Sequence, residues 1–310
     1  MNRFIEKDSK IKNNNGFQLA CKAKEGLTVF QGRWKKMKKL LICFIFVIFF
    51  LGYPLQPLAQ FTGGELVERE KWEKFLEDAE ITEFSQPLSE REARTKPWRL
   101  RLEKDGVTRY AWWKNVEGRV QGFLEGWKWE IAAYRLDKLL GLNMVPPCIE
   151  KRFQEERGSC SLEIDVKMMY RELIEQNIEI PPQYAHSTLR AVFLMRAWDN
   201  LIANQDRNWG DILITEDWRI IIIDHSRTFR TSKKSKTRLI YEGKEEKEPI
   251  MELPRVFVEN LKGLTFEKIR DAVGAYLKDK EIEAVLIRRD LMLKDIDRLI
   301  EKFGEDRFLY

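Results

Sequence analysis

The stretch "WDNLIANQDRNWGDIL", residues 198–213, leads through two short apolar runs to "IIIDHSRTF", residues 221–229. A helical pattern ends in a polar loop that holds Asp206, and Asp211 stands directly before the first apolar run. Asp224 directly follows the second run. Short apolar runs rich in β-branched residues are typical of buried strands, so we expect a rigid hairpin that fixes these three carboxylates relative to one another.

Three carboxylates and one amine are the side chains that phosphoryl transfer needs. The reaction requires an acceptor for the proton of the nucleophile, oxygen ligands for Mg²⁺ and a cation on the nucleotide phosphates. Asp206 can accept the proton, and Asp211 and Asp224 can bind the metal. Lys114, at the end of an expected strand, can supply the cation, and Glu130 in the following helix can hold that amine in place.

Each of these residues, taken singly, has a commoner structural explanation. An Asp in a loop rich in Asn, Asp and Gly usually stabilises a turn, a strand-end lysine is usually solvated, and a helical glutamate is usually exposed. The tryptophans near these residues are better explained as core residues than as a platform for stacking bases. The order of the whole set along the chain favours a site.

The rest of the chain predicts two unlike halves. Residues 98–114 alternate around Asp105-Gly106 and predict a hairpin, and residues 127–140 predict a helix that Gly141 ends. A glycine-containing linker lies between them, and a second hairpin is expected over 148–166. Helical patterns dominate afterwards, so we expect an α+β fold with a small strand-rich lobe followed by a larger helical lobe.

Four stretches carry a resemblance to a known family: "YAWWK" (110–114), "WEIAAYRLDKLLGLNMVPP" (129–147) and the two stretches quoted first. The chain resembles the atypical kinase group that joins phosphoinositide-kinase-like and HipA-like proteins. The resemblance covers residues 98–229 and implies a two-lobed protein-kinase-like fold, with one helix in the small lobe.

The resemblance also implies roles. Asp206 would be the catalytic Asp and Asp224 a metal-binding Asp, with Lys114 on the α- and β-phosphates and Glu130 as its partner. Where the family usually carries Asn, five residues after the catalytic Asp, this chain has Asp211, which can still bind Mg²⁺ but adds a negative charge. No Gly-x-Gly-x-x-Gly loop is present, so the Asp105-Gly106 turn would have to cover the phosphates. ATP and Mg²⁺ or Mn²⁺ are the implied cofactors.

The N-terminal region predicts export. Four lysines precede a twelve-residue apolar run, Leu40 to Leu51, which is short for a membrane span and typical of a signal peptide. We expect translation to start at Met37, because a signal peptide does not normally follow a polar preface. The expected divisions are an extension that is not native (1–36), a signal peptide or uncleaved membrane anchor (37–59), an N-terminal helical brace (60–97), the small lobe (98–166) and the large lobe (167–310).

The distribution of charge bears on the partners of the protein, and the cysteines bear on a possible disulfide. The net charge of +5 arises from residues 1–59, which hold 11 Lys and Arg against 3 Asp and Glu, because the remainder holds 44 basic and 47 acidic residues and is slightly negative. That balance argues against a nucleic-acid partner. Cys148 and Cys160 would form a disulfide across the second hairpin or remain two separate thiols, and the sequence leaves both open.

These observations favour an exported ATP-dependent phosphotransferase whose acceptor is a hydroxyl of a protein, glycan or lipid. One alternative is a catalytically inactive kinase fold that serves as a binding or scaffolding module in the cell envelope. Another is a transferase that moves AMP instead of phosphate with similar metal ligands. The acceptor cannot be read from the sequence, and the membrane would be a partner only through a retained N-terminal anchor.

Overall fold

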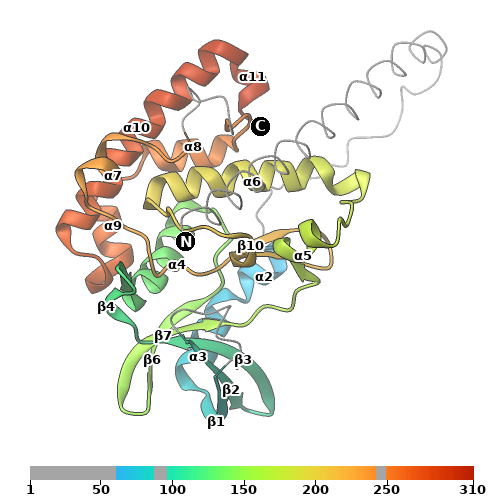
Figure 1. Ribbon diagram of the computed structural model, residues 1–310, viewed down its shortest axis with the longest axis vertical. Coiled ribbons are helices and arrows are strands. Elements are labelled where there is room, and N and C mark those ends of the chain that lie inside the picture. Colours follow the sequence, from blue (N-terminus) through green and yellow to red (C-terminus); the bar gives the residue numbers. More distant parts are fainter. Residues whose placement is uncertain (1–60, 87–95, 242–248) are drawn as a thin grey trace, which may run out of the picture. The chain divides into compact units, whose positions relative to one another are not determined.

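The computed structural model describes residues 61–86, 96–241 and 249–310, which belong to one compact unit, residues 57–310. The expected extension, signal peptide and apolar run lie outside the described residues. No helix in the described part combines the length and the apolar character that crossing a bilayer requires. Figure 1 shows a sheet-rich part at the bottom and a helical part above it.

The small lobe is built on one five-stranded antiparallel sheet, with the strand order β1-β2-β3-β7-β6. The strands are β1 (Glu80–Ser85), β2 (Trp98–Lys104), β3 (Val107–Lys114), β6 (Cys148–Phe153) and β7 (Glu156–Leu162). The hairpin predicted around Asp105-Gly106 is confirmed, and both turn residues have positive φ, 51° and 76°, as the favoured two-residue hairpin turn requires. The hairpin predicted for residues 148–166 is also present, but its second strand ends at Leu162.

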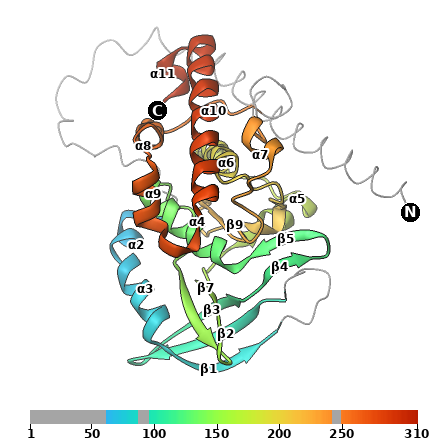
Figure 2. The same ribbon diagram turned by 90° about the vertical axis from the view of Figure 1, so that its left-hand side faces the viewer.

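Helices cover both faces of this sheet. The predicted N-terminal helix is present as α2 (Gly63–Val67) and α3 (Arg69–Asp78), and Lys151 donates to three carbonyl groups at the end of α3, those of Leu76, Glu77 and Ala79. The helix α4 (Trp127–Leu140) has the predicted bounds and ends at Gly141, whose φ is 64°. Figure 2 shows α3 and α4 beside the strands.

Two segments differ from the prediction. Strand β1 was not predicted, since its residues were assigned to the helical brace, and its side chains are mostly exposed. The segment expected to be a linker forms a second small sheet of β4 (Glu117–Val120) and β5 (Phe123–Gly126). Its turn uses Gln121 and Gly122 with φ of 49° and 86°. Such a turn is usually predicted from Asn-Gly or Asp-Gly, and glutamine in the first position gives no such signal.

The large lobe contains the remaining elements. They are β8 (Met168–Met169), α5 (Tyr170–Glu175), α6 (Pro182–Ile202), η1 (Trp209–Asp211), β9 (Ile212–Ile214), β10 (Ile220–Ile222), α7 (Lys233–Thr237), α8 (Arg255–Lys262), α9 (Phe266–Val273), η2 (Gly274–Tyr276), α10 (Asp279–Phe303) and α11 (Glu305–Phe308). The predicted strand pair is confirmed as β9 and β10, and Trp218 lies in the turn between them with φ of 63°.

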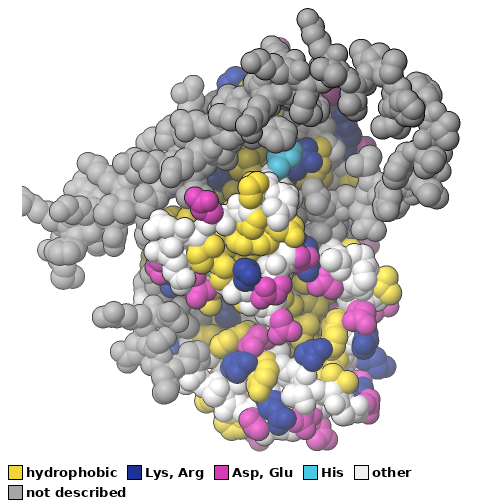
Figure 3. All heavy atoms as spheres, turned by 90° about the vertical axis from the view of Figure 1, so that its right-hand side faces the viewer, with side chains coloured by type: hydrophobic (Ala, Val, Ile, Leu, Met, Phe, Trp, Pro, Cys, Tyr) yellow, Lys and Arg dark blue, Asp and Glu magenta, His cyan; other side chains and the backbone are white. Residues whose placement is uncertain are grey.

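The hydrophobic cores explain how the lobes hold together. The largest core joins α4 to α6, α8, α9 and α10, and so links the helix of the small lobe to the large lobe. A separate core fills the other face of the five-stranded sheet, under α3, and contains Leu76, Leu100 and Trp113. In Figure 3 basic and acidic side chains are interspersed over the coloured lower part of the visible face, without a continuous basic patch there.

The two cysteines of the second hairpin, Cys148 and Cys160, lie on opposite faces of the five-stranded sheet. Cys148 pairs with Ser161, and Cys160 pairs with Ile149. Neighbouring residues of a strand point to opposite faces, so the two thiols lie on opposite sides, and each belongs to a different core. Both are buried free cysteines, and the register excludes the disulfide that the sequence left open.

Candidate active site

The alternation of strand β3 directs Lys114 toward α4. Ala111 and Trp113 are buried in the core under α3, so Trp112 and Lys114 point to the opposite face. Lys114 pairs with Ser159 of β7, and Gly158 makes room there, because a Cβ atom at Gly158 would come within 2.4 Å of the carbonyl oxygen of Lys114. The neighbouring strand thus requires a residue without a side chain.

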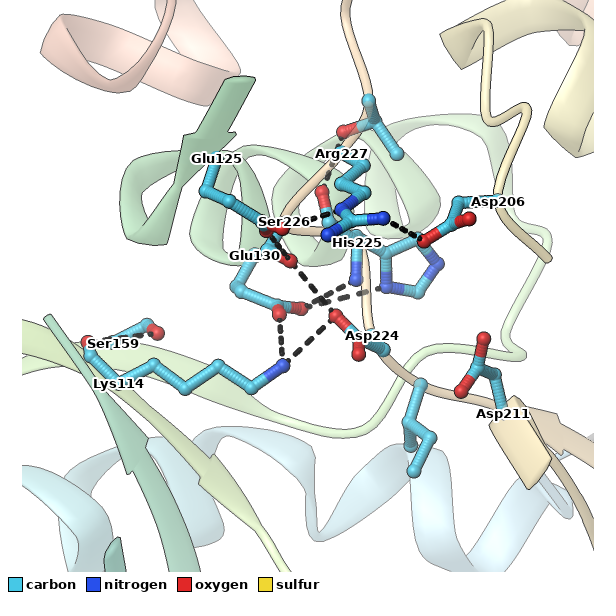
Figure 4. Close-up of polar contacts among 12 residues, drawn as sticks. Lys114, Glu125, Glu130, Ser159, Asp206, Asp211, Asp224, His225, Ser226 and Arg227 are labelled. Atoms are coloured by element: carbon cyan, nitrogen blue, oxygen red, sulfur yellow. Dashed lines mark hydrogen bonds and ion pairs between the residues drawn. The ribbon is translucent and has the colours of Figure 1, made fainter. Parts of the chain in front are cut away.

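The amine of Lys114 binds two carboxylates (Figure 4). Its Nζ lies 2.8 Å from Oε1 of Glu130 in the first turn of α4 and 2.9 Å from Oδ1 of Asp224 after β10. Burial opposes the charged form of Lys114, but the two carboxylates outweigh it and raise the pKa of the amine above its ordinary value. Lys114 therefore stays protonated and joins the two lobes.

Glu130 is held by more than the lysine. Its Oε2 accepts a hydrogen bond of 2.9 Å from the backbone N–H of His225. Burial alone would favour the protonated acid, yet Lys114 and His225 lower the pKa of Glu130 well below its usual range. An ionised carboxylate with fixed donors on both oxygens keeps the amine in one place.

Asp224 occupies an unusual backbone conformation directly after β10. Its φ is 57°, in the left-handed region that non-glycine residues adopt rarely, Asp among the more frequent. Its side chain is 42% exposed, and Lys114 and the hydroxyl of Ser226 help to keep its pKa below the ordinary value against the effect of burial. The carboxylate is ionised and faces open space.

Asp211 lies close enough to Asp224 for the two charges to interact. Its Oδ2 accepts hydrogen bonds from the backbone and side-chain nitrogens of Asn208, at 3.1 and 2.6 Å. Burial, followed by the charge of Asp224, raises the pKa of Asp211 to about 7. Two adjacent carboxylates that repel one another form a place where a divalent cation is stabilised.

Asp206 lies on the other side of Asp224 from Lys114 (Figure 4). The side chain of Asp206 is 49% exposed, and its Oδ2 accepts a hydrogen bond of 2.7 Å from Nη1 of Arg227. The structure thus brings Lys114, Glu130 and Asp224 into direct contact and places Asp211 and Asp206 beside them.

The loop that carries Asp206 is fixed by a buried ion pair. Nη2 of Arg207 lies 2.9 Å from Oδ1 of Asp199 at the end of α6. Arg207 also donates to the carbonyl oxygen of Ile223 at 2.5 Å and contacts Nε2 of His225 at 3.2 Å. These bonds connect the loop to the segment around Asp224.

The phosphates cannot be covered as the resemblance implied. The Asp105-Gly106 turn lies at the far end of β3 from Lys114, roughly 26 Å along the strand at the usual rise per residue. The expectation that this turn covers the nucleotide is therefore wrong. The turn between β6 and β7 lies at the same end of the sheet as Lys114, because Ser159 pairs with Lys114.

Sequence reasoning also missed three residues of the site. Glu125, Ser226 and Arg227 are buried and form one set of polar contacts beside Asp224 and Asp206. Their only signal in the sequence is position, because Ser226 and Arg227 follow Asp224 closely and Glu125 precedes Glu130 by five residues.

A resident metal would have to be held by few protein atoms. Residues 61–86, 96–241 and 249–310 contain no group of three His, Cys, Asp or Glu side chains arranged to hold a metal ion. Two carboxylates, Asp211 and Asp224, remain, and this donor set fits Mg²⁺, which keeps several waters and takes phosphate oxygens as further ligands.

Comparison with known proteins identifies the fold. No protein-family model and no curated protein matches the chain. The solved structures that resemble it include a Golgi casein kinase with Mn/ADP bound, with a TM-score of 0.56, 13% identity and coverage of 80% of both chains. A Fam20 protein of hydra, solved with sugar, has a TM-score of 0.55 and 14% identity, and the match covers 79% of this chain and 92% of that one. The predicted kinase-like α+β fold is confirmed.

Proposed function

We propose that the protein is an ATP-dependent phosphotransferase that moves the γ-phosphoryl group of ATP to a hydroxyl of a protein, glycan or lipid. The observation that carries this proposal is the contact of Lys114 with both Glu130 and Asp224. Lysine held by a helical glutamate, next to an acidic residue that follows a buried strand, is the arrangement that kinases use to bind nucleotide phosphates.

The side chains divide the work as follows. Lys114 binds the α- and β-phosphates while Glu130 keeps its amine in place. Asp224 and Asp211 hold Mg²⁺ or Mn²⁺, which when bound neutralises the charge that develops on the phosphoryl oxygens. Asp206 accepts the proton of the acceptor hydroxyl with the carboxylate oxygen that Arg227 leaves free. A similar fold has been solved with Mn/ADP bound, which supports this choice of cofactors.

Asp211 makes this site more acidic than one with Asn in the same place. Without a cation the carboxyl group titrates near pH 7, and a bound cation would favour its ionised form. The extra charge stabilises a divalent ion but repels the triphosphate, so we expect a strict requirement for metal before nucleotide binds.

We also propose that the protein works after export. The basic and apolar pattern of residues 35–51 is that of a signal peptide, and one structure with a similar fold is described as a Golgi kinase. Kinship with the phosphoinositide-kinase-like and HipA-like group stays a proposal as well, supported by the four quoted motifs in their order.

The test is incubation of the purified protein with casein and an envelope extract, with ATP labelled on either the γ- or the α-phosphate. We expect label from the γ-position to appear on an acceptor in the presence of Mg²⁺ or Mn²⁺, and to disappear with EDTA. Label from the α-position alone would indicate transfer of AMP. No transfer of either label, together with no binding of nucleotide, would leave the scaffold as the function.

A further inference from the structure

Arg227 binds two carboxylates, those of Glu125 and Asp206. The proposed reaction gives a role only to Asp206. Its Nε donates to Oε1 of Glu125, and its Nη1 donates to Oδ2 of Asp206 at 2.7 Å. The guanidinium group also lies over the ring of Phe123, with 4.4 Å from Cζ to the ring centroid. Strand β5, which carries Phe123 and Glu125, is thereby connected to the loop that carries Asp206 (Figure 4).

Glu125 and Arg227 are buried, whereas Asp206 is half-exposed. The side chains of Glu125 and Arg227 are 1% and 5% exposed, whereas that of Asp206 is 49% exposed. A planar guanidinium group that binds acceptors through two different edges can take few orientations. Arg227 is therefore a fixed donor, and Asp206 is a half-exposed group that would otherwise turn more freely.

Asp206 depends on this contact. Among the described residues, the bond from Arg227 is the one hydrogen bond that the carboxylate of Asp206 makes. The bond occupies Oδ2 and leaves Oδ1 without a hydrogen bond to any described residue. A carboxylate whose second oxygen is fixed can present the first to an acceptor hydroxyl in one orientation, which is what a general base requires.

We propose that Arg227 is a positioning residue for Asp206 and that Glu125 is the buried anchor that fixes Arg227. The inference rests on the proposed phosphotransferase function and adds two residues to it. Neither residue contacts the nucleotide in this assignment, so both act on turnover through the orientation of Asp206.

Ser226 extends the same set of contacts to the metal-binding side of the cleft. Its hydroxyl lies 2.6 Å from Oε2 of Glu125 and 3.0 Å from Oδ1 of Asp224. A hydroxyl group has one proton to donate, so it can bind only one of the two carboxylates at a time. Contacts between neighbours therefore lead from Asp224 through Ser226, Glu125 and Arg227 to Asp206.

A purely structural pair that only attaches β5 to the large lobe is the competing explanation. Both explanations predict a loss of stability when the pair is broken, because breaking a buried ion pair leaves an uncompensated charge. The two explanations differ in the effect on kcat that they predict. A structural pair would leave the kcat of the folded protein nearly unchanged, as substitution of an Arg–Glu pair elsewhere should, and it would act independently of Asp206.

The experiment uses Arg227→Lys, which keeps the positive charge but replaces the planar fork of donors with a single ammonium group on a flexible chain, and Glu125→Gln, which keeps the shape of the anchor. The matched controls are Arg157→Lys and Glu150→Gln, which alter an Arg–Glu pair on the β6–β7 hairpin whose arginine is 56% exposed. We expect kcat to fall about 100-fold in Arg227→Lys, the loss that a small misplacement of a reacting group causes. The KM for ATP should stay within about twofold, as for an interaction made only in the transition state.

Dependence on Asp206 is measured by combining substitutions. In an Asp206→Asn background, Arg227→Lys should cause no further loss of kcat, because residues that act as one unit are not additive. Losses that multiply would overturn the positioning role. If Arg227→Lys does not fold, the double variant Glu125→Gln with Arg227→Gln removes both buried charges together and should show the same loss of kcat.

Crystal structures of the wild type and Arg227→Lys separate this inference from the proposed function. We expect the Asp206 carboxylate to occupy one position in the wild type and to be displaced in the variant, whether or not phosphate is transferred. An unchanged Asp206 would overturn the positioning role. An intact Arg227–Asp206 contact in a wild type that transfers no phosphate would overturn the proposed function and leave the positioning contact in place.

Discussion

Lys114 at the end of β3 and Asp224 after β10 form an ion pair of 2.9 Å, although 110 residues separate them in the sequence. Each residue also binds a second group, since Lys114 binds Glu130 and Asp224 accepts a hydrogen bond from Ser226. The pair therefore fixes the small lobe against the large one at the point where a nucleotide phosphate would lie.

Glu130→Gln should weaken binding of Mg²⁺-ATP about tenfold, or ~1.4 kcal/mol, because the amine of Lys114 loses its buried ionic partner and is drawn toward Asp224. Calorimetric titration measures the affinity. Glu117→Gln is the matched control, since its Lys128 partner is an exposed ion pair and such pairs contribute little. Equal affinities for Glu130→Gln and the wild type would contradict the role of Glu130.

Gly158→Ala should disturb the position of Lys114 without touching any charged group. The added Cβ atom would come within 2.4 Å of the Lys114 carbonyl oxygen and 2.6 Å of the Trp113 ring, so the strands must shift, at a cost of about 1–3 kcal/mol in the free energy of unfolding. Thermal melting and nucleotide titration check both effects. Gly64→Ala, where the nearest atom is 4.0 Å away, should melt no lower than the wild type.

Binding of Mg²⁺ should strengthen as the pH rises from 6 to 8. The pKa of Asp211 is raised to about 7 by burial and by the charge of Asp224, so its proton must leave before the carboxylate can bind a cation. The stability of the metal-free protein follows the opposite trend: the folded state binds this proton more tightly than the unfolded chain, so the contribution of Asp211 to stability decreases as the pH rises from about 4 to 7.

Calorimetry in buffers with different ionisation enthalpies measures the proton released when Mg²⁺ binds. Asp211→Asn has no proton to release at this position, so its Mg²⁺ affinity should depend less on pH. A wild type whose Mg²⁺ affinity is the same at pH 6 and pH 8 would contradict this assignment.

Cys148 and Cys160 should remain separate thiols even in the absence of reductant. Burial raises the pKa of both, to about 12 for Cys160, so neither forms a reactive thiolate at neutral pH. Alkylation followed by mass spectrometry should label both residues in denaturant and neither in the native protein. A disulfide-linked peptide that contains both residues would show that the strand register is wrong.

Local patterns predicted the elements that position the site. The hairpin at Asp105-Gly106, the helix of residues 127–140 and the strand pair before Asp224 have strong local signals, namely turn chemistry, a glycine cap and β-branched runs. Those signals also place Lys114, Glu130 and Asp224 at the ends of their elements, where they meet in the structure. The fold class follows from the same order of elements.

The remaining contacts depend on residues that are distant in the sequence. The partner of Arg207 is Asp199 and not its neighbour Asp206, because the loop turns back toward the end of α6. Arg227 and Glu125 are 102 residues apart, and an arginine and a glutamate in polar surroundings carry no sign that they will be buried together. The hairpin of β4 and β5 was missed for a local reason: its turn begins with Gln121, which is not a typical turn residue.

The most direct test of the site is the affinity of three proteins for Mg²⁺-ATP, measured by calorimetry alongside transfer of the γ-phosphate. We expect the wild type and Asp206→Ala to bind with affinities within about threefold of one another, a difference of ~0.7 kcal/mol. Asp224→Ala should fold but lose the metal-dependent binding, and neither variant should transfer phosphate. Normal transfer by both variants, or binding by Asp224→Ala as tight as that of the wild type, would contradict the assignment of this cleft as the active site.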